Sequence, residues 1–326
     1  MPDIRDAGVV AVVAAAGGLA MGLAKLGASG WLARGVFAGL KGWQVLNAGA
    51  FAINIASVSV PGRVDGEMAA DAQRAARAAK TAATAATSDT ADTPAGIPRD
   101  HWSRGLFSPA GWAFAIWGVI FLGETVFTAA QALPDLDPNT ATTYAAVSPW
   151  WAAACGLQAL WCVAFRPWTR PPRRFWLSGA LLAAESVALA GAHGQLRAAV
   201  HAVPLSAYFC CHLPLSLHFG WITAATVLSL NSFVAVAGAS PRTKITTARA
   251  SAWVSLAAGA TVTVTSGDPV YALTLAWALA AVAADGGKSA TETIDESRLA
   301  NVSRDAARAA RSLVAVAALV AFAKVF

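Results

Sequence analysis

Residues 105–133 form an apolar run whose only charged side chain is Glu124. A helix rises about 1.5 Å per residue, so a run of this length crosses a hydrocarbon core of roughly 30 Å. Further apolar runs follow, and charged residues make up only 13% of the chain, against about a quarter in soluble proteins. The chain is therefore predicted to be all-α, a polytopic bundle of about seven to eight transmembrane helices.

Breaks in charge and composition divide the chain into five segments. In order, they are an N-terminal apolar or amphipathic extension (1–41), a first crossing (42–62), a charged Ala-rich insertion (63–104), a transmembrane core (105–284) and an amphipathic segment that runs into a C-terminal helix (285–326). Within the core we expect a helix at 148–165, a re-entrant or interfacial piece at 198–212 and a full crossing at 214–237. Whether the uncharged run at 7–24 also spans is left open.

The basic residues act as topology signals. Successive loops after residue 62 carry six, none, four, one, three, none and five Lys or Arg residues. Such alternation is typical of a chain that crosses a bilayer repeatedly, with its basic loops on the cytoplasmic, matrix or stromal side. We therefore expect an integral protein of a bacterial inner membrane or of an organellar membrane, plastid thylakoid or mitochondrial.

Composition argues against several other classes of function. The net charge of +6 is spread over short loops instead of one basic patch, which argues against nucleic-acid binding. Cys155 and Cys162 lie in apolar runs, and the contiguous Cys210, Cys211 and His212 cannot present three tetrahedral ligands from one helix. We predict no metal site of that type, and without a nucleophile–base constellation or a phosphate loop we predict no enzyme activity.

An aromatic pattern opens the core. It begins at residue 107 and reads Phe-x-Pro-x-x-Trp-x-Phe-x-x-Trp-x-x-x-Phe. Pro109 is expected in the first helical turn, where its missing N–H costs nothing, and Trp112, Trp117 and Phe121 follow at helical spacings. Glu124 lies about one turn beyond. Because an ionisable group at that depth costs roughly 3 kcal/mol or more against lipid, Glu124 should face the bundle interior.

This pattern resembles the first helix of the TspO/MBR family of tryptophan-rich sensory proteins, which are related to the mitochondrial translocator protein. Residues 213–226 and 268–277 add to the resemblance, which covers roughly 45–325 with an interruption near 67–99 and is similar to a divergent branch with extra helices. The family's usual Trp-x-Pro-Pro is replaced by Phe-Ser-Pro-Ala at 107–110. The resemblance implies a bundle of five helices that binds porphyrins and, in animals, sterols. The matching positions are Pro109, Trp112, Phe114, Trp117, Phe121, Trp221 and Trp277, and we add Glu124 to this candidate ligand site.

Other polar side chains inside the apolar runs must pair with each other, with backbone or with a ligand. Several of them are histidines crowded into 193–218, and a neutral imidazole is a good axial ligand for a tetrapyrrole metal. Interhelical hydrogen bonding is the alternative interpretation. The candidate axial ligands are His193, His201, His212, His218, Gln158 and Glu185.

Three functions are consistent with these features. The first is a membrane protein that binds a tetrapyrrole (porphyrin, haem or chlorophyll type) or another small apolar ligand as a sensor or carrier. The second is a structural, pigment-binding subunit of a larger photosynthetic membrane complex. The third is a secondary transporter in which Glu124 and Glu185 carry protons. Expected partners are membrane lipid, the ligand, and a membrane complex or a second copy of the chain.

Overall fold

The structure of the protein is a computed structural model that describes residues 36–37, 39–60, 105–133, 136–166, 172–198, 204–287 and 294–324. The expectations for the run at 7–24, for the insertion at 63–104 and for His201 lie outside this part of the chain.

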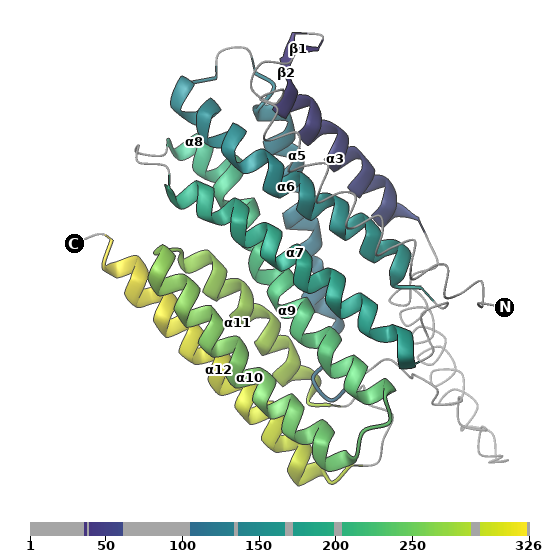
Figure 1. The fold of residues 1–326 in the computed structure, drawn as a ribbon. Coiled ribbons are helices and arrows are strands. Elements are labelled where there is room, and N and C mark those ends of the chain that lie inside the picture. The colour runs from purple at the N-terminus through teal and green to yellow at the C-terminus, as the bar shows by residue number, and fades with distance from the viewer. Residues whose placement is uncertain are drawn as a thin grey trace, which may run out of the picture.

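The described residues form a bundle of eight long helices (Figure 1), and the expected all-α membrane fold is confirmed. A short antiparallel hairpin, β1 (Val36–Phe37) with β2 (Leu40–Lys41), precedes them. The helices are α3 (Gly42–Ser59), α5 (Ile116–Ala130), α6 (Pro138–Ala164), α7 (Pro172–Ala198), α9 (Leu213–Val236), α10 (Pro241–Ser266), α11 (Pro269–Asp285) and α12 (Glu296–Phe322).

Three helical stretches are long and apolar enough to cross a membrane, judged by length and composition. They are Gly111–Ala130, Arg174–Ala198 and Leu205–Val236, and α11 is a shorter apolar helix. Much of their surface is open to the surroundings, including the exposed side chains of Val119, Val187 and Leu230. Because exposed apolar surface of this extent is unfavourable in water, these faces suit contact with lipid.

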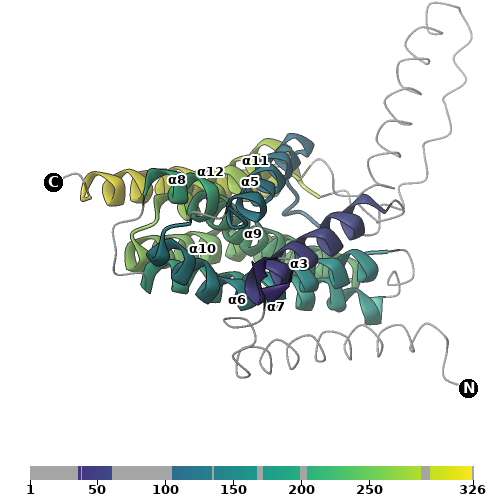
Figure 2. The same ribbon diagram turned by 90° about the horizontal axis from the view of Figure 1, so that it is seen from above.

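Two groups of helices meet at α9. In the first group, α3 packs on α6, α6 on α7 and α7 on α9. In the second group, α10 and α11 pack on α12, and both also contact α9. Figures 1 and 2 show α9 in the middle of the bundle, with α5 crossing near it. Helix α9 therefore contacts both groups of helices, through α7 on one side and through α10 and α11 on the other.

Local sequence sets most of the helix ends. Asp137, Ser240 and Asp268 each accept a hydrogen bond from a backbone N–H in the first turn of the helix that follows. A proline follows each of these caps, at the position where a missing N–H is tolerated. Helices α10 and α11 end at Gly267 and Gly286, whose φ angles of +66° and +59° favour glycine.

Three expected boundaries were wrong. Pro109 lies before the first helical turn, a 3₁₀ helix, η1 (Gly111–Ala115), that leads into α5. Helix α6 begins at Pro138 instead of residue 148, because Asp137 caps it and Pro138 fits its first turn, and Pro149 lies inside it. The described part of 198–212 contains α8 (Leu205–Ala207) and a π-helix, η3 (Tyr208–His212), that continue into α9. Pro214 cannot donate to Cys210, so the turn widens without ending the helix.

Small residues allow the helices to approach closely. A Cβ atom added to Gly123 of α5 would lie 2.5 Å from Pro214 of α9, and one added to Gly220 of α9 would lie 2.7 Å from Thr274 of α11. Since transmembrane helices associate by close packing instead of by hydrophobic burial from water, these contacts hold α5, α9 and α11 together.

Candidate functional site

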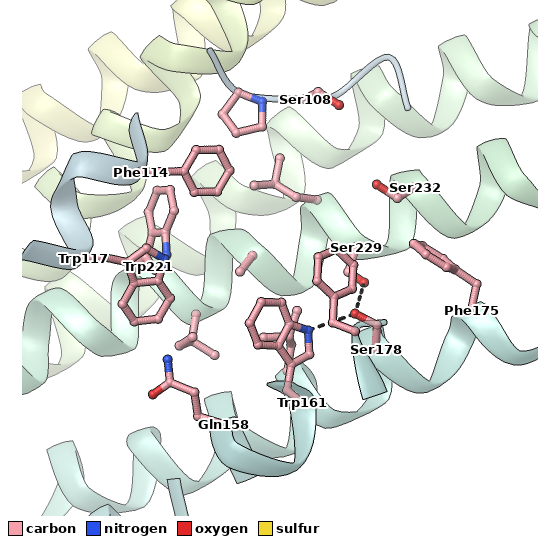
Figure 3. Close-up of a pocket in the computed structure, with 16 residues that line it drawn as sticks. Ser108, Phe114, Trp117, Gln158, Trp161, Phe175, Ser178, Trp221, Ser229 and Ser232 are labelled. Atoms are coloured by element: carbon pink, nitrogen blue, oxygen red, sulfur yellow. Dashed lines mark hydrogen bonds between the residues drawn. The ribbon is translucent and has the colours of Figure 1, made fainter. Parts of the chain in front are cut away.

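A cavity of about 150 Å³ lies between η1, α5, α6, α7 and α9, and we call it the aromatic cavity (Figure 3). Its wall is mainly aromatic and apolar, and its polar atoms come from serine hydroxyls and the Gln158 amide. The lining residues are Ser108, Pro109, Phe114, Trp117, Gln158, Trp161, Phe165, Phe175, Ser178, Leu182, Trp221, Ile222, Ala225, Leu228, Ser229 and Ser232.

The rings on the α5 and α9 side of this cavity hold one another in place. Trp221 meets the edges of Phe114 and Trp117 at centroid distances of 5.6 and 6.2 Å, with interplanar angles of 83° and 82°. Trp117 also stacks on Phe121 at 5.1 Å. Edge-to-face and offset stacked contacts are the favoured arrangements of aromatic rings, so this wall is ordered without a ligand.

The opposite wall combines rings with hydroxyl groups. The indole N–H of Trp161 donates to Ser178 over 2.9 Å, and the Trp161 ring stacks on Phe165 at 4.9 Å. Figure 3 shows Trp161 and Ser178 on the other side of the cavity from Phe114 and Trp221. Trp161 and Phe165 were not among the candidate residues predicted from the sequence, although their spacing of four residues near the end of an expected helix was a visible signal.

Gln158 supplies an amide at the inner end of the aromatic cavity. Its Oε1 accepts a hydrogen bond of 2.6 Å from Asn54 of α3, whereas its buried Nε2 has no partner. Figure 3 shows this nitrogen on the side of Trp117 and Trp221. A buried N–H without an acceptor costs about 1 to 3 kcal/mol, so a ligand acceptor at this position would be stabilised.

A second feature is the cluster of Glu124, His218 and Glu185, one residue each from α5, α9 and α7, which we call the Glu–His–Glu cluster. All three side chains are fully buried, at 0% exposure. His218 Nδ1 lies 2.7 Å from Glu124 Oε1, and His218 Nε2 lies 3.2 Å from Glu185 Oε1. Because a neutral imidazole has only one N–H, both contacts are made only by an imidazolium or with a protonated carboxyl group.

The cluster touches the wall of the aromatic cavity. Trp117 meets His218 edge to face at 5.6 Å, and Trp151 donates its indole N–H to Glu124 Oε1 over 2.9 Å. Each carboxylate keeps one buried oxygen, Oε2, without a partner. Only the Trp117 ring therefore separates His218 from a ligand in the aromatic cavity, so gain or loss of a proton at the cluster would change the charge next to that ligand.

The structure brings four of the eight candidate ligand residues into the aromatic cavity, namely Pro109, Phe114, Trp117 and Trp221. Phe121 stacks behind Trp117, and Glu124 belongs to the cluster. Trp112 and Trp277 instead pack on each other at 4.6 Å, both about half-exposed, and Trp277 donates to the carbonyl of Ala113. Trp112 lies in the 3₁₀ turn η1, before α5 begins, and this turn directs its side chain away from the cavity wall.

The candidate axial ligands do not converge on one point. Among those in the described part of the chain, Gln158 lines the aromatic cavity, while Glu185 and His218 are engaged in the Glu–His–Glu cluster. His193 and His212 lie near the other end of α7 and α9. The lining therefore suits contact with the faces and edges of a flat ligand, and an imidazole from the described residues is not placed to ligate a metal in it. The described residues contain no group of three or more His, Cys, Asp or Glu side chains that could hold a metal ion.

A cavity at that other end was not anticipated from the sequence. We call it the end cavity; it has a volume of about 280 Å³ and lies against His193, Arg197, Tyr208, His212 and Asp268, among others. Its signal in the sequence was the pair of charges, Arg197 and Asp268, that each close an apolar run.

The fold and these two cavities define a polytopic helical membrane protein with an internal aromatic cavity. Comparison with protein families places the chain in one of them. The model of the TSPO-like protein family matches residues 85–322, and the chain belongs to that family. Helix α3 lies before the match, although it contributes Asn54 to the hydrogen bond with Gln158. No curated protein and no solved structure matches the chain.

Proposed function

We propose that this TSPO-like membrane protein binds a flat apolar ligand of the tetrapyrrole class in the aromatic cavity and acts as a sensor or carrier. The observation that supports the proposal most directly is the cavity itself, where aromatic rings from η1, α5, α6, α7 and α9 surround one unpaired amide nitrogen, Gln158 Nε2. Apolar pockets with a few placed polar groups are the usual form of small-molecule sites.

Different residues of the cavity would make different contacts with the ligand. Trp117, Trp221 and Phe114 offer ring surfaces to the ligand, and Gln158 offers a hydrogen bond that fixes its orientation. A bound tetrapyrrole would supply the large conjugated surface and its light absorption. The cavity of about 150 Å³ is below the common range of about 300 to 1,000 Å³. A whole tetrapyrrole therefore requires lining side chains to move aside, and we expect Phe114, which is 46% exposed, to be one of them.

Titration of the detergent-purified protein with protoporphyrin IX, followed by porphyrin fluorescence, tests this proposal. Trp117→Ala removes one wall, and we expect affinity to fall on the order of tenfold, since one aromatic contact contributes about 1 kcal/mol beyond its buried area. Trp253→Ala is the matched control, because Trp253 is a half-exposed tryptophan on α10 away from the cavity. Equal affinities for the wild type and both variants would refute binding in the aromatic cavity.

The alternative function is a structural, pigment-binding subunit of a larger photosynthetic membrane complex. An absorption spectrum of the protein from its native membrane separates the two functions. A co-purifying chlorophyll band together with migration as a discrete large complex would favour the subunit, whereas porphyrin binding by the isolated chain favours the sensor or carrier.

The Glu–His–Glu cluster favours a second candidate function, proton-linked transport of the ligand. Ionisable groups inside membrane bundles commonly form proton relays, and this cluster has two unpaired carboxylate oxygens beside the cavity wall. In proteoliposomes with a pH gradient, porphyrin uptake should depend on the gradient and should lose that dependence in Glu185→Gln. Glu296→Gln, an exposed carboxylate on α12, is the control. Uptake that ignores the gradient in the wild type excludes this function.

A further inference from the structure

The end cavity is built where two membrane-crossing helices terminate. Arg197 is next to the last residue of the stretch Arg174–Ala198, and Tyr208 and His212 lie in the first turns of Leu205–Val236. The turn between α10 and α11, at Gly267 and Asp268, and the end of α12 close the cavity. It lies at the opposite end of α7 and α9 from the aromatic cavity.

Both carboxylate oxygens of Asp268 already have hydrogen-bond partners within the protein. Its Oδ2 accepts hydrogen bonds from Ser216 (2.5 Å) and contacts His193 Nε2 (2.8 Å), and its Oδ1 accepts from the backbone N–H of Val270 (2.9 Å). Burial by itself would raise the pKa of Asp268, but the bonds from His193 and Ser216 outweigh it, and the pKa lies below its ordinary value. This carboxylate is therefore ionised and already satisfied by its own donors.

Two cations share the mouth of the same cavity. A point one bond length from Gly267 Cα, where a Cβ would stand, lies 3.4 Å from Arg197 Nη2 and 3.5 Å from Lys324 Nζ. Neither side chain forms an ion pair with a carboxylate of the described residues. Two like charges that lie within about 3.5 Å of one common point repel each other, and an anion at that point would be attracted by both.

The surroundings suit an oxyanion. A guanidinium group presents a planar fork of donors that matches phosphate geometry, and an ammonium group adds a compact point charge. Tyr208 and His212 contribute further polar groups to the lining. The volume of about 280 Å³ exceeds what a single phosphate group fills, so the cavity also accommodates what the phosphate is esterified to.

We propose that the end cavity binds a phosphate group, held between Arg197 and Lys324. The depth of the site favours the headgroup of an anionic phospholipid as its source, because the ends of membrane-crossing helices lie at the level of lipid phosphates. A soluble phosphate shares the same chemistry. This site is independent of the aromatic cavity and of any ligand bound there.

The test uses the full chain in nanodiscs of phosphatidylcholine. The thermal unfolding midpoint is measured in the neutral lipid alone, with phosphatidylglycerol added to the discs, and with inorganic phosphate in the buffer. We expect phosphatidylglycerol to raise the midpoint in proportion to its content, because a ligand that binds only the folded state stabilises it. The paired substitution Arg197→Gln with Lys324→Gln should remove this rise.

The control removes two charges elsewhere. Arg298→Gln with Arg304→Gln alters two exposed arginines near the start of α12 and should leave the rise intact. Lys324→Gln alone, close to the end of the chain, gives a second variant that is safe for folding and should weaken lipid binding on the order of tenfold, as expected for the loss of one charge-assisted bond.

Three results of the unfolding measurements would overturn all or part of the proposal. A rise that survives in the paired Arg197→Gln and Lys324→Gln variant, or that disappears equally in the control with Arg298→Gln and Arg304→Gln, overturns the site. A rise with inorganic phosphate and none with phosphatidylglycerol, lost in the paired variant, supports the phosphate site and overturns the lipid as its source.

Discussion

Single polar residues in this bundle acquire their partners from distant parts of the chain. Glu124 and His218 stand 94 positions apart and meet at 2.7 Å, while His193 is paired with Asp268 across 75 positions. Hydropathy predicted that Glu124 must face inward, because lipid contact is costly. It did not predict which of the histidines would face it.

The first prediction concerns Asp268→Asn. The substitution keeps the shape of the side chain but removes its charge, so the contact with His193 and the short bond from Ser216 weaken, and we expect a loss of about 1 to 3 kcal/mol at neutral pH. The measurement is the thermal unfolding midpoint in detergent, with Glu296→Gln as the control.

The pH dependence follows from the lowered pKa of Asp268. A carboxyl group whose pKa is lower in the folded state stabilises the protein at every pH above its unfolded pKa, which for Asp is about 3.9. That stabilisation is lost as the pH falls from there through the folded pKa. The difference between wild type and Asp268→Asn should therefore shrink on acidification in that range, and a constant difference would contradict this account.

At the scale of elements, α5 packs on α9 through a glycine. A Cβ at Gly123 would lie 2.5 Å from Pro214 Cγ, whereas a Cβ at Gly118, on the same helix, would meet no atom within 4 Å. The second prediction is that Gly123→Ala destabilises the protein by about 1 to 3 kcal/mol, because the helices must separate.

Gly118→Ala is the matched substitution for this prediction. It should be neutral or stabilise by up to about 1 kcal/mol, the difference in helix propensity between the two residue types. Thermal unfolding of both variants in one detergent gives the comparison. The packing of α5 against α9 would be misassigned if the two variants unfolded at the same temperature.

At the scale of the whole molecule, the helices alternate in direction so that the basic turns gather at one end of the bundle. Helix α7 begins and α9 ends at the end that carries the α9–α10 turn, whereas the end of α5 and the α10–α11 turn lie at the other (Figure 1). The basic end is expected to face the cytoplasmic, matrix or stromal side.

The third prediction tests this orientation with cysteine labelling in intact bacterial cells. Ala132→Cys lies just after α5 and Ala239→Cys in the turn between α9 and α10. In a Cys210→Ala background, in which Cys155, Cys162 and Cys211 are buried, an impermeant maleimide should label Ala132→Cys. Ala239→Cys should react only after the cells are opened. The reverse pattern would invert the assigned topology.

The amino-acid sequence by itself determined that this chain is a helical membrane bundle of the TSPO-like family. Long apolar runs must be helical in lipid, because only a helix satisfies its own backbone hydrogen bonds there, and the aromatic pattern after residue 107 carried the family signal.

The tertiary structure decided which side chains meet. The 3₁₀ turn at Gly111–Ala115 sent Trp112 to the surface with Trp277, and α6 and α7 brought Trp161, Phe175 and Ser178 to the aromatic cavity. Helical periodicity assigns a residue to a face of its own helix, but the rotation and depth of each helix depend on packing against neighbours that are distant in the sequence.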